Sequence, residues 1–153
     1  MTKLFFSTIL LFIFPASAFT QTKTISAIKL NQFIKVDGNP DDEAWNSIPA
    51  VSEFVTSTPV FGTNASRKTE VKITYDNTAV YVLAYLYDEP KKIKRHLTER
   101  DQVDENDVDV FSIGIDTYND KQNAFTFKVS AAGVQEDAKV SAIEDVTWNA
   151  VWE

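Results

Sequence analysis

Carboxylates gather around the apolar runs in the middle of this 153-residue chain, and carboxylate oxygens are ligands that calcium prefers. Four of them stand next to the end of an apolar run: Asp88, Asp107, Asp109 and Asp116. If the runs are neighbouring strands, these side chains could converge and, with turn carbonyls, build a shell of about six to eight oxygens. No loop has the ligand spacing of an EF-hand, so the pattern is also typical of a solvated acidic rim. We therefore predict structural calcium, with these four residues as candidate ligands.

Asp107 and Asp109 also have a spacing that invites comparison with acid–base catalysis. On one strand they would lie ~6.6–6.8 Å apart along the chain, within the carboxyl separation of inverting glycosidases. That reaction needs its two carboxyl groups on opposite sides of a sugar, which a shared strand face does not provide. His96 is the single histidine, and no serine and acid stand out as its partners in a triad. The sequence therefore singles out no catalytic residue.

Residues 79–87 form an apolar run in which both faces of a strand would carry large side chains. Tyr85 and Tyr87 would share a face with Tyr81 and Leu83, since strand side chains alternate. Tyrosine is common in strands, so one interpretation is a central strand covered by a loop or another domain. The other is an open aromatic surface, on which sugars stack their C–H faces while the tyrosine hydroxyl forms hydrogen bonds. Tyr85 and Tyr87 are the candidate sugar-binding residues of this run.

The elements expected to position these residues are almost all strands. Residues 69–75 alternate apolar and polar side chains, and with the turn that follows and the run 79–87 they predict a β-hairpin. Further strands are expected over residues 25–36, 107–116, 123–130 and 134–141. Turns at intervals of roughly 8–12 residues are typical of a β-sandwich. The predicted fold is all-β, an antiparallel, jelly-roll-like β-sandwich over residues 19–153.

One short helical turn is expected near the start of this domain. Asp37-Gly38 suits a tight turn, Asn39 can cap a helix, and Pro40 suits the first helical position, where an amide donor would have no partner. Trp45 follows one turn later and is predicted to insert into a core. Residues 36–45 should therefore form a folded plug rather than a loose loop.

The two ends predict an exported protein that is truncated at its C-terminal end. Lys3, the apolar run 4–14 and the small residues Ala16-Ser17-Ala18 have the pattern of a signal peptide over residues 1–18. The apolar run is too short to cross a bilayer, which takes ~20 residues. Residues 146–153 resemble a strand interrupted in mid-run. We expect a secreted, periplasmic or outer-membrane-associated location, without a membrane span in this sequence.

Composition excludes several classes of partner. The chain has a net charge of −7 and no cysteine. Nucleic acids and anionic membranes need a basic surface, so neither is expected as a partner, and a disulfide framework is excluded. The negative net charge is compatible with calcium and with glycans as ligands.

Four motifs then follow one another in a familiar order. They are Val36-Asp37-Gly38 with Asp42-Glu43-Ala44-Trp45, residues 71–76 with 80–84, residues 106–111 with Ile115-Asp116, and residues 125–129. Together they resemble the family 9 carbohydrate-binding modules. The resemblance implies a β-sandwich that binds polysaccharides or oligosaccharides, that often accompanies secreted polysaccharide hydrolases, and that holds calcium in some members.

Other motifs narrow the resemblance to one group. Arg100-Asp101 and residues 116–120, 133–137 and 148–153 are similar to long exported bacterial proteins of uncharacterised function that begin with this domain. The resemblance implies that sugar-binding members of the family hold the glycan between two tryptophan rings. One of these tryptophans would lie just before the acidic strand. Residues 101–104 offer no aromatic side chain at that place. The other ring would come from the C-terminal end, which makes Trp148 and Trp152 candidate sugar-binding residues.

Two hypotheses follow. The first is a secreted non-catalytic carbohydrate-binding module in a larger protein of polysaccharide catabolism. In this hypothesis any hydrolase activity on O-glycosyl compounds belongs to the larger protein and not to the module. The second is a structural or interaction domain that has lost the sugar clamp and covers its aromatic face with its own C-terminal, outer-membrane-associated region.

Overall fold

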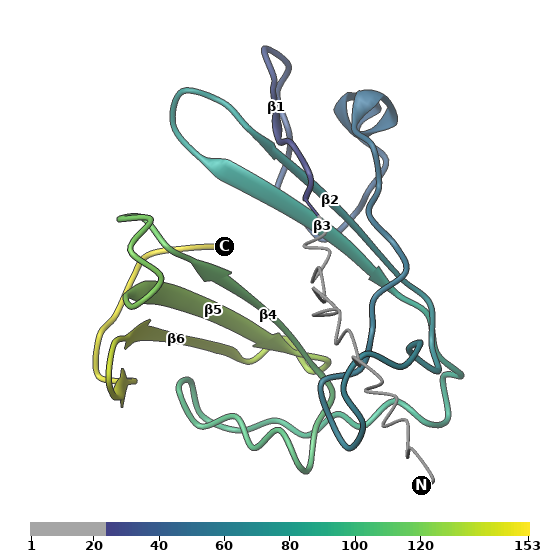
Figure 1. Ribbon diagram of the computed structural model, residues 1–153. Helices are drawn as coiled ribbons and strands as arrows, with labels where there is room; N and C mark the ends of the chain where they lie inside the picture. Colours follow the sequence, from purple (N-terminus) through teal and green to yellow (C-terminus); the bar gives the residue numbers. More distant parts are fainter. Residues whose placement is uncertain (1–23) are drawn as a thin grey trace, which may run out of the picture.

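The computed structural model describes residues 24–153, whose regular structure is almost entirely β (Figure 1). The predicted signal peptide, residues 1–18, lies outside the described residues. Over residues 24–153, none of the helices has the length and apolar character needed to cross a membrane.

The first sheet contains β1 (Ile28–Lys29), β2 (Thr69–Tyr75) and β3 (Val80–Leu86), in that order. β2 and β3 are the predicted hairpin, paired in antiparallel register along their whole length. The Asp76 carboxylate fixes the turn between them, because Oδ1 accepts hydrogen bonds from the amides of Thr78 (2.6 Å) and Ala79 (2.9 Å). β1 lies parallel to the other edge of β2.

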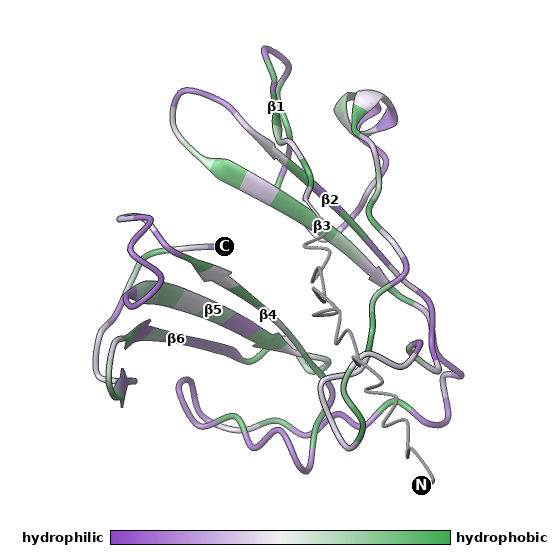
Figure 2. Ribbon diagram, viewed as in Figure 1, coloured by the Kyte–Doolittle hydropathy of each residue, from purple (hydrophilic) through white to green (hydrophobic). Residues whose placement is uncertain are grey.

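The second sheet contains β4 (Val110–Ile115), β5 (Ala124–Ser130), β6 (Gln135–Val140) and β7 (Glu144–Asp145), all antiparallel. The two sheets form two layers, and the C-terminal segment ends between them (Figure 1). Figure 2 shows apolar residues along β3 and hydrophilic residues in the turn between β2 and β3. The predicted all-β sandwich is confirmed.

The inner faces of the two sheets follow the predicted alternation. Phe111, Ile113 and Ile115 of β4 share a face with the phenylalanines of β5, and this face looks toward Val80 and Val82 of β3. A cleft of about 470 Å³ lies between these side chains. The interior of the sandwich is therefore apolar but incompletely filled by the described residues.

Three predicted strands have different bounds. Of residues 25–36, only Ile28–Lys29 form a strand, β1, and Leu30 and Ile34 are buried core residues instead. The strand expected over residues 107–116 begins only at Val110. The amides of Asp107 and Val108 both donate to the Asp104 carbonyl and close a turn, so these two residues lie before the strand. The predicted strand over residues 146–153 is wrong: β7 ends at Asp145, and the chain then continues as an irregular segment.

The main buried cluster lies on the outer side of the first sheet. Leu30, Ile34, Ala44, Trp45 and Ile48 form it, together with Tyr81 and Leu83 of β3. Trp45 is 6% exposed, which confirms its predicted insertion into a core.

The helical turn that carries Trp45 differs from the prediction in its start. It is the short 3-10 helix η1 (Glu43–Ser47), and its N-cap is Asp42 rather than Asn39. Asn39 is held in a preceding turn instead, where its amide donates to Asp37 Oδ1 (2.9 Å). The Asp42 carboxylate is also engaged elsewhere, because it accepts a hydrogen bond from the amide of Lys35 (3.0 Å). Local side-chain bonds therefore delay the start of the helix.

Candidate functional site

The outer face of β3 is divided into a covered half and an open half. Tyr81 and Leu83 lie under the buried cluster of the N-terminal segment. Tyr85 and Tyr87, further along the same face, are 38% and 46% exposed. A loop thus covers part of this strand, as one interpretation of the sequence expected, while the two candidate tyrosines remain open.

The two open tyrosines form a short aromatic surface. Their ring centroids are 6.3 Å apart and their planes are inclined by 24°. This is the arrangement that alternate residues of one strand face allow, since they are ~6.6–6.8 Å apart along the chain. The pair offers two neighbouring ring faces on one side of the sheet.

Polar side chains border this surface. The Tyr87 hydroxyl donates to Glu70 Oε2 (2.8 Å), and Lys68 Nζ lies 2.8 Å from Glu70 Oε1 and 5.0 Å from the centre of the Tyr87 ring. Hydrogen bonds from Lys68 and Tyr87 lower the pKa of Glu70, so its carboxylate is ionised at neutral pH. The same hydrogen bond to Glu70 raises the pKa of Tyr87. The site therefore combines apolar rings with fixed donors and acceptors.

A hollow of about 560 Å³ adjoins this surface. Lys68, which contacts the Tyr87 ring, is also part of the wall of the hollow. The remaining wall comes from Ser52, Glu53, Phe54, Asn64, Ala65, Arg67 and Thr69. Lys68 thus joins the tyrosine pair to a depression of mixed polar and apolar lining.

The two candidate tryptophans lie elsewhere, on the inner face of the second sheet. Trp148 contacts Phe125 at 4.6 Å and Phe127 at 6.1 Å between ring centroids, and Trp152 contacts the edge of Phe127 at 5.4 Å. The four predicted sugar-binding residues therefore fall into two separate pairs, one open and one in contact with the phenylalanines of β5.

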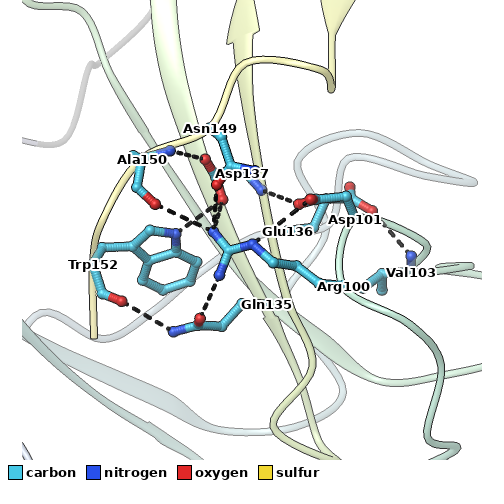
Figure 3. A network of polar contacts seen from close by, with 9 residues as sticks. All are labelled: Arg100, Asp101, Val103, Gln135, Glu136, Asp137, Asn149, Ala150 and Trp152. Carbon is cyan, nitrogen blue, oxygen red and sulfur yellow. Dashed lines mark hydrogen bonds and ion pairs between the residues drawn. The ribbon is translucent and has the colours of Figure 1, made fainter.

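A polar network holds the C-terminal segment in this position (Figure 3). Asp137 of β6 is 1% exposed and accepts hydrogen bonds from the amide of Ala150 (2.6 Å), the Trp152 indole (3.2 Å) and the Arg100 guanidinium. Burial alone raises the pKa of Asp137, but these hydrogen bonds and the positive charge of Arg100 outweigh it and lower the pKa. Asp137 is therefore a buried, ionised and fully paired carboxylate.

Sequence reasoning did not assign a role to Asp137 or Arg100. The available signal was the alternation in β6, where Gln135, Asp137 and Lys139 fall on the face that carries Phe125 and Phe127 in β5. A polar row on an otherwise apolar inner face requires buried partners. Arg100, which lies in the long charged connection, supplies one of them.

The family described as carbohydrate family 9 binding domain-like matches residues 36–151. The chain belongs to this family. Membership supports carbohydrate binding as the general function of the domain. No curated protein and no solved structure matches the chain.

The predicted calcium ligands of this family 9 domain are spread over the sandwich. Asp88 and Asp109 line one cleft of about 390 Å³ between the sheets. Asp116 follows the far end of β4, about 23 Å from Asp109 at a strand rise of ~3.3 Å per residue. Asp107 pairs with His96 at 2.6 Å. The four carboxylates therefore do not surround one point.

Each of these carboxylates also has protein partners in the family 9 domain. Asp88 accepts from Arg67 Nε (2.7 Å), Asp109 accepts from the Lys94 amide (3.0 Å), and Asp116 accepts from the amides of its own loop. Among residues 24–153 no group of three or more histidine, cysteine or acidic side chains is placed to hold a metal ion. Calcium stays a prediction.

Proposed function

We propose that this family 9 domain is a non-catalytic carbohydrate-binding module whose glycan stacks on Tyr85 and Tyr87. The observation that carries the proposal is the half-exposed, nearly parallel ring pair beside Lys68 and Glu70. Rings supply apolar area for the C–H face of a sugar, and the charged neighbours supply hydrogen bonds to its hydroxyl groups.

The tryptophan pair supports this role less well. Trp148 and Trp152 use their rings against Phe125 and Phe127, and the Trp152 indole N–H is already donated to Asp137. The cleft that Trp152 borders is otherwise lined mainly by valine, isoleucine and phenylalanine side chains. Such a wall offers sugar hydroxyls few hydrogen-bonding partners, and burying them there is costly.

The proposed setting is an exported protein of polysaccharide catabolism that uses this module to stay close to its substrate. The signal-peptide pattern of residues 1–18 and the resemblance to domains that accompany secreted polysaccharide hydrolases support this setting. Calcium is proposed as a structural ion. Asp88 and Asp109, which line the same cleft, are the first pair to test.

The proposal can be tested by isothermal titration calorimetry. The full-length protein is titrated with soluble polysaccharides, once with calcium and once without. We expect saturable binding of one glycan class that Tyr87→Ala weakens about three- to tenfold. Tyr118→Ala is the control, because Tyr118 is an exposed tyrosine (71%, against 46% for Tyr87) in the loop after β4. Absence of binding to any glycan by the folded protein would overturn the proposal.

The second candidate function is that of a structural or interaction domain. It is favoured by the unfilled interior, where Val80 and Leu86 on the inner face of β3 remain 58% and 51% exposed. It expects Tyr85 and Tyr87 to be shielded by another region of the full-length protein. Tyrosine nitration mapped by mass spectrometry separates the two: modification of both rings supports the sugar site, and protection of both rings without sugar supports the structural role.

A further inference from the structure

The hollow beside the tyrosine pair lies at the edge of the first sheet, where Arg67 and Thr69 of its wall also line the cleft between the sheets. Val51 and Val71 exchange two backbone hydrogen bonds (2.8 and 2.9 Å), so the segment before Phe54 runs along the edge of β2. On the other side, the Tyr87 amide donates to the Lys68 carbonyl (3.0 Å). Residues near 54, 68 and 87 therefore lie on three adjacent chain segments. The two outer segments are about 10 Å apart, which is twice the spacing between neighbouring strands.

The wall of the hollow has the side chains that a sugar needs. The Phe54 ring is 41% exposed. The side chains of Ser52 and Asn64 form no hydrogen bond with any residue of the described range 24–153. An accessible ring next to unengaged hydroxyl and amide groups is the combination that binds the apolar face and the hydroxyl edge of a pyranose.

The two basic side chains of the wall are both paired with carboxylates. Arg67 pairs with Asp88 at 2.7 Å and with Glu89 at 3.6 Å, and Lys68 pairs with Glu70 at 2.8 Å. A carboxylate or sulfate group on a sugar would have to displace one of these partners and would lie close to the others. Like charges at such distances repel one another, so the surface selects against anionic sugars.

We infer that the binding site extends from Tyr85 and Tyr87 past Lys68 into this hollow, and that its ligand is a neutral oligosaccharide. Phe54 provides a further stacking ring, and Ser52 and Asn64 bind hydroxyl groups of the sugar that lies in the hollow. The inference rests on the proposed function, to which it adds the length, direction and charge of the ligand.

The test compares ligands of increasing length on the full-length protein. Cello-, xylo- and manno-oligosaccharides are titrated from the monosaccharide to the hexasaccharide, with oligogalacturonides as the anionic counterpart. We expect the Kd of the best-binding neutral series to fall about three- to tenfold beyond the disaccharide. We expect oligogalacturonides of equal length to bind more weakly.

Variants locate the gain in affinity. Phe54→Ala should weaken binding of the longer chains more than binding of the disaccharide, and Asn64→Ala should reduce the gain for the longer chains. Phe61→Ala is the matched control, because Phe61 belongs to the same loop, is 82% exposed and is not part of the wall. Thermal unfolding of each variant confirms that the fold is intact.

The outcomes separate the two proposals. A Kd independent of chain length, or equal behaviour of Phe54→Ala and Phe61→Ala, would overturn the extended site while Tyr87-dependent binding preserves the proposed function. Tighter binding of oligogalacturonides would overturn the neutral ligand. A wild-type protein that binds none of these sugars or the polysaccharides of the first titration would overturn the proposed function, and the extended site with it.

Discussion

The two sheets use an aromatic pair and a nearby carboxylate in opposite ways. In the first sheet Tyr85 and Tyr87 are open, and the Tyr87 hydroxyl donates to the partly exposed Glu70. In the second sheet Trp148 and Trp152 lie against phenylalanines, and the Trp152 indole donates to the buried Asp137. The residue types alone do not distinguish a ligand surface from a structural contact. Burial of the polar partner does.

The largest expected effect is on the structural side of this comparison. Trp152→Ala removes the ring contact with Phe127 and one donor to Asp137, and should lower the free energy of unfolding by about 2–4 kcal/mol. Tyr87→Ala should leave it nearly unchanged. Urea denaturation of the two variants measures the difference. Equal destabilisation by both would show that the tyrosine ring is also structural and would break the comparison.

The next effect compares two arginine–aspartate pairs, Arg100 with Asp137 and Arg67 with Asp88. Arg100→Met leaves Asp137 buried with two neutral donors, and should cost about 2–3 kcal/mol because an uncompensated buried charge is unfavourable. Arg67→Met, its matched control, removes an exposed pair with Asp88 and should have no measurable effect. Arg100→Lys should rescue part of the loss, because it restores the charge but not the forked geometry. If both methionine variants unfold alike, Asp137 does not depend on Arg100.

Much of the first sheet could be predicted from the sequence, for a physical reason. The hairpin of β2 and β3 is encoded locally, by alternation of side chains and by the turn at Asp76, so its pairing follows from neighbouring residues. Trp45 could be assigned to a core because a large ring one turn after an acidic helix start has few alternatives. The family followed from the order of such local motifs.

The second sheet shows where this reasoning stops. The role of Asp137 depends on Arg100 and Trp152, which are 37 and 15 residues away in the chain. A pattern of side chains does not reveal contacts at that separation. For the same reason the sequence treated Trp152 as part of a strand and as a sugar ligand, while its contacts with Phe127 and Asp137 were not visible in any local motif.

A smaller effect is expected on glycan affinity when only the hydroxyl group of Tyr87 is removed. Tyr87→Phe keeps the ring and removes only the hydroxyl that donates to Glu70. We expect it to retain most of the glycan affinity, whereas Tyr87→Ala loses about three- to tenfold. Calorimetry with the best-binding glycan measures both. If Tyr87→Phe loses as much as Tyr87→Ala, hydrogen bonding rather than stacking carries the affinity, and the ring pair is not a stacking surface.

The smallest effect concerns Asp76, the partly exposed carboxylate that fixes the hairpin of the first sheet. Hydrogen bonds from Thr78, through its amide and hydroxyl, and from the Ala79 amide lower the pKa of Asp76 from 3.8 to about 2. Because the pKa is lower in the folded state, the ionised carboxylate stabilises the protein fully above pH 3.8, and this contribution is lost as the pH falls toward 2. Asp76→Asn cannot titrate, so the difference in unfolding free energy between wild type and variant should be constant above pH 4 and shrink below it. Denaturation of both proteins at a series of pH values measures this difference. A difference that stays constant down to pH 2 would mean that the turn holds without the charge, and that the first sheet, like the second, depends on packing more than on its exposed polar groups.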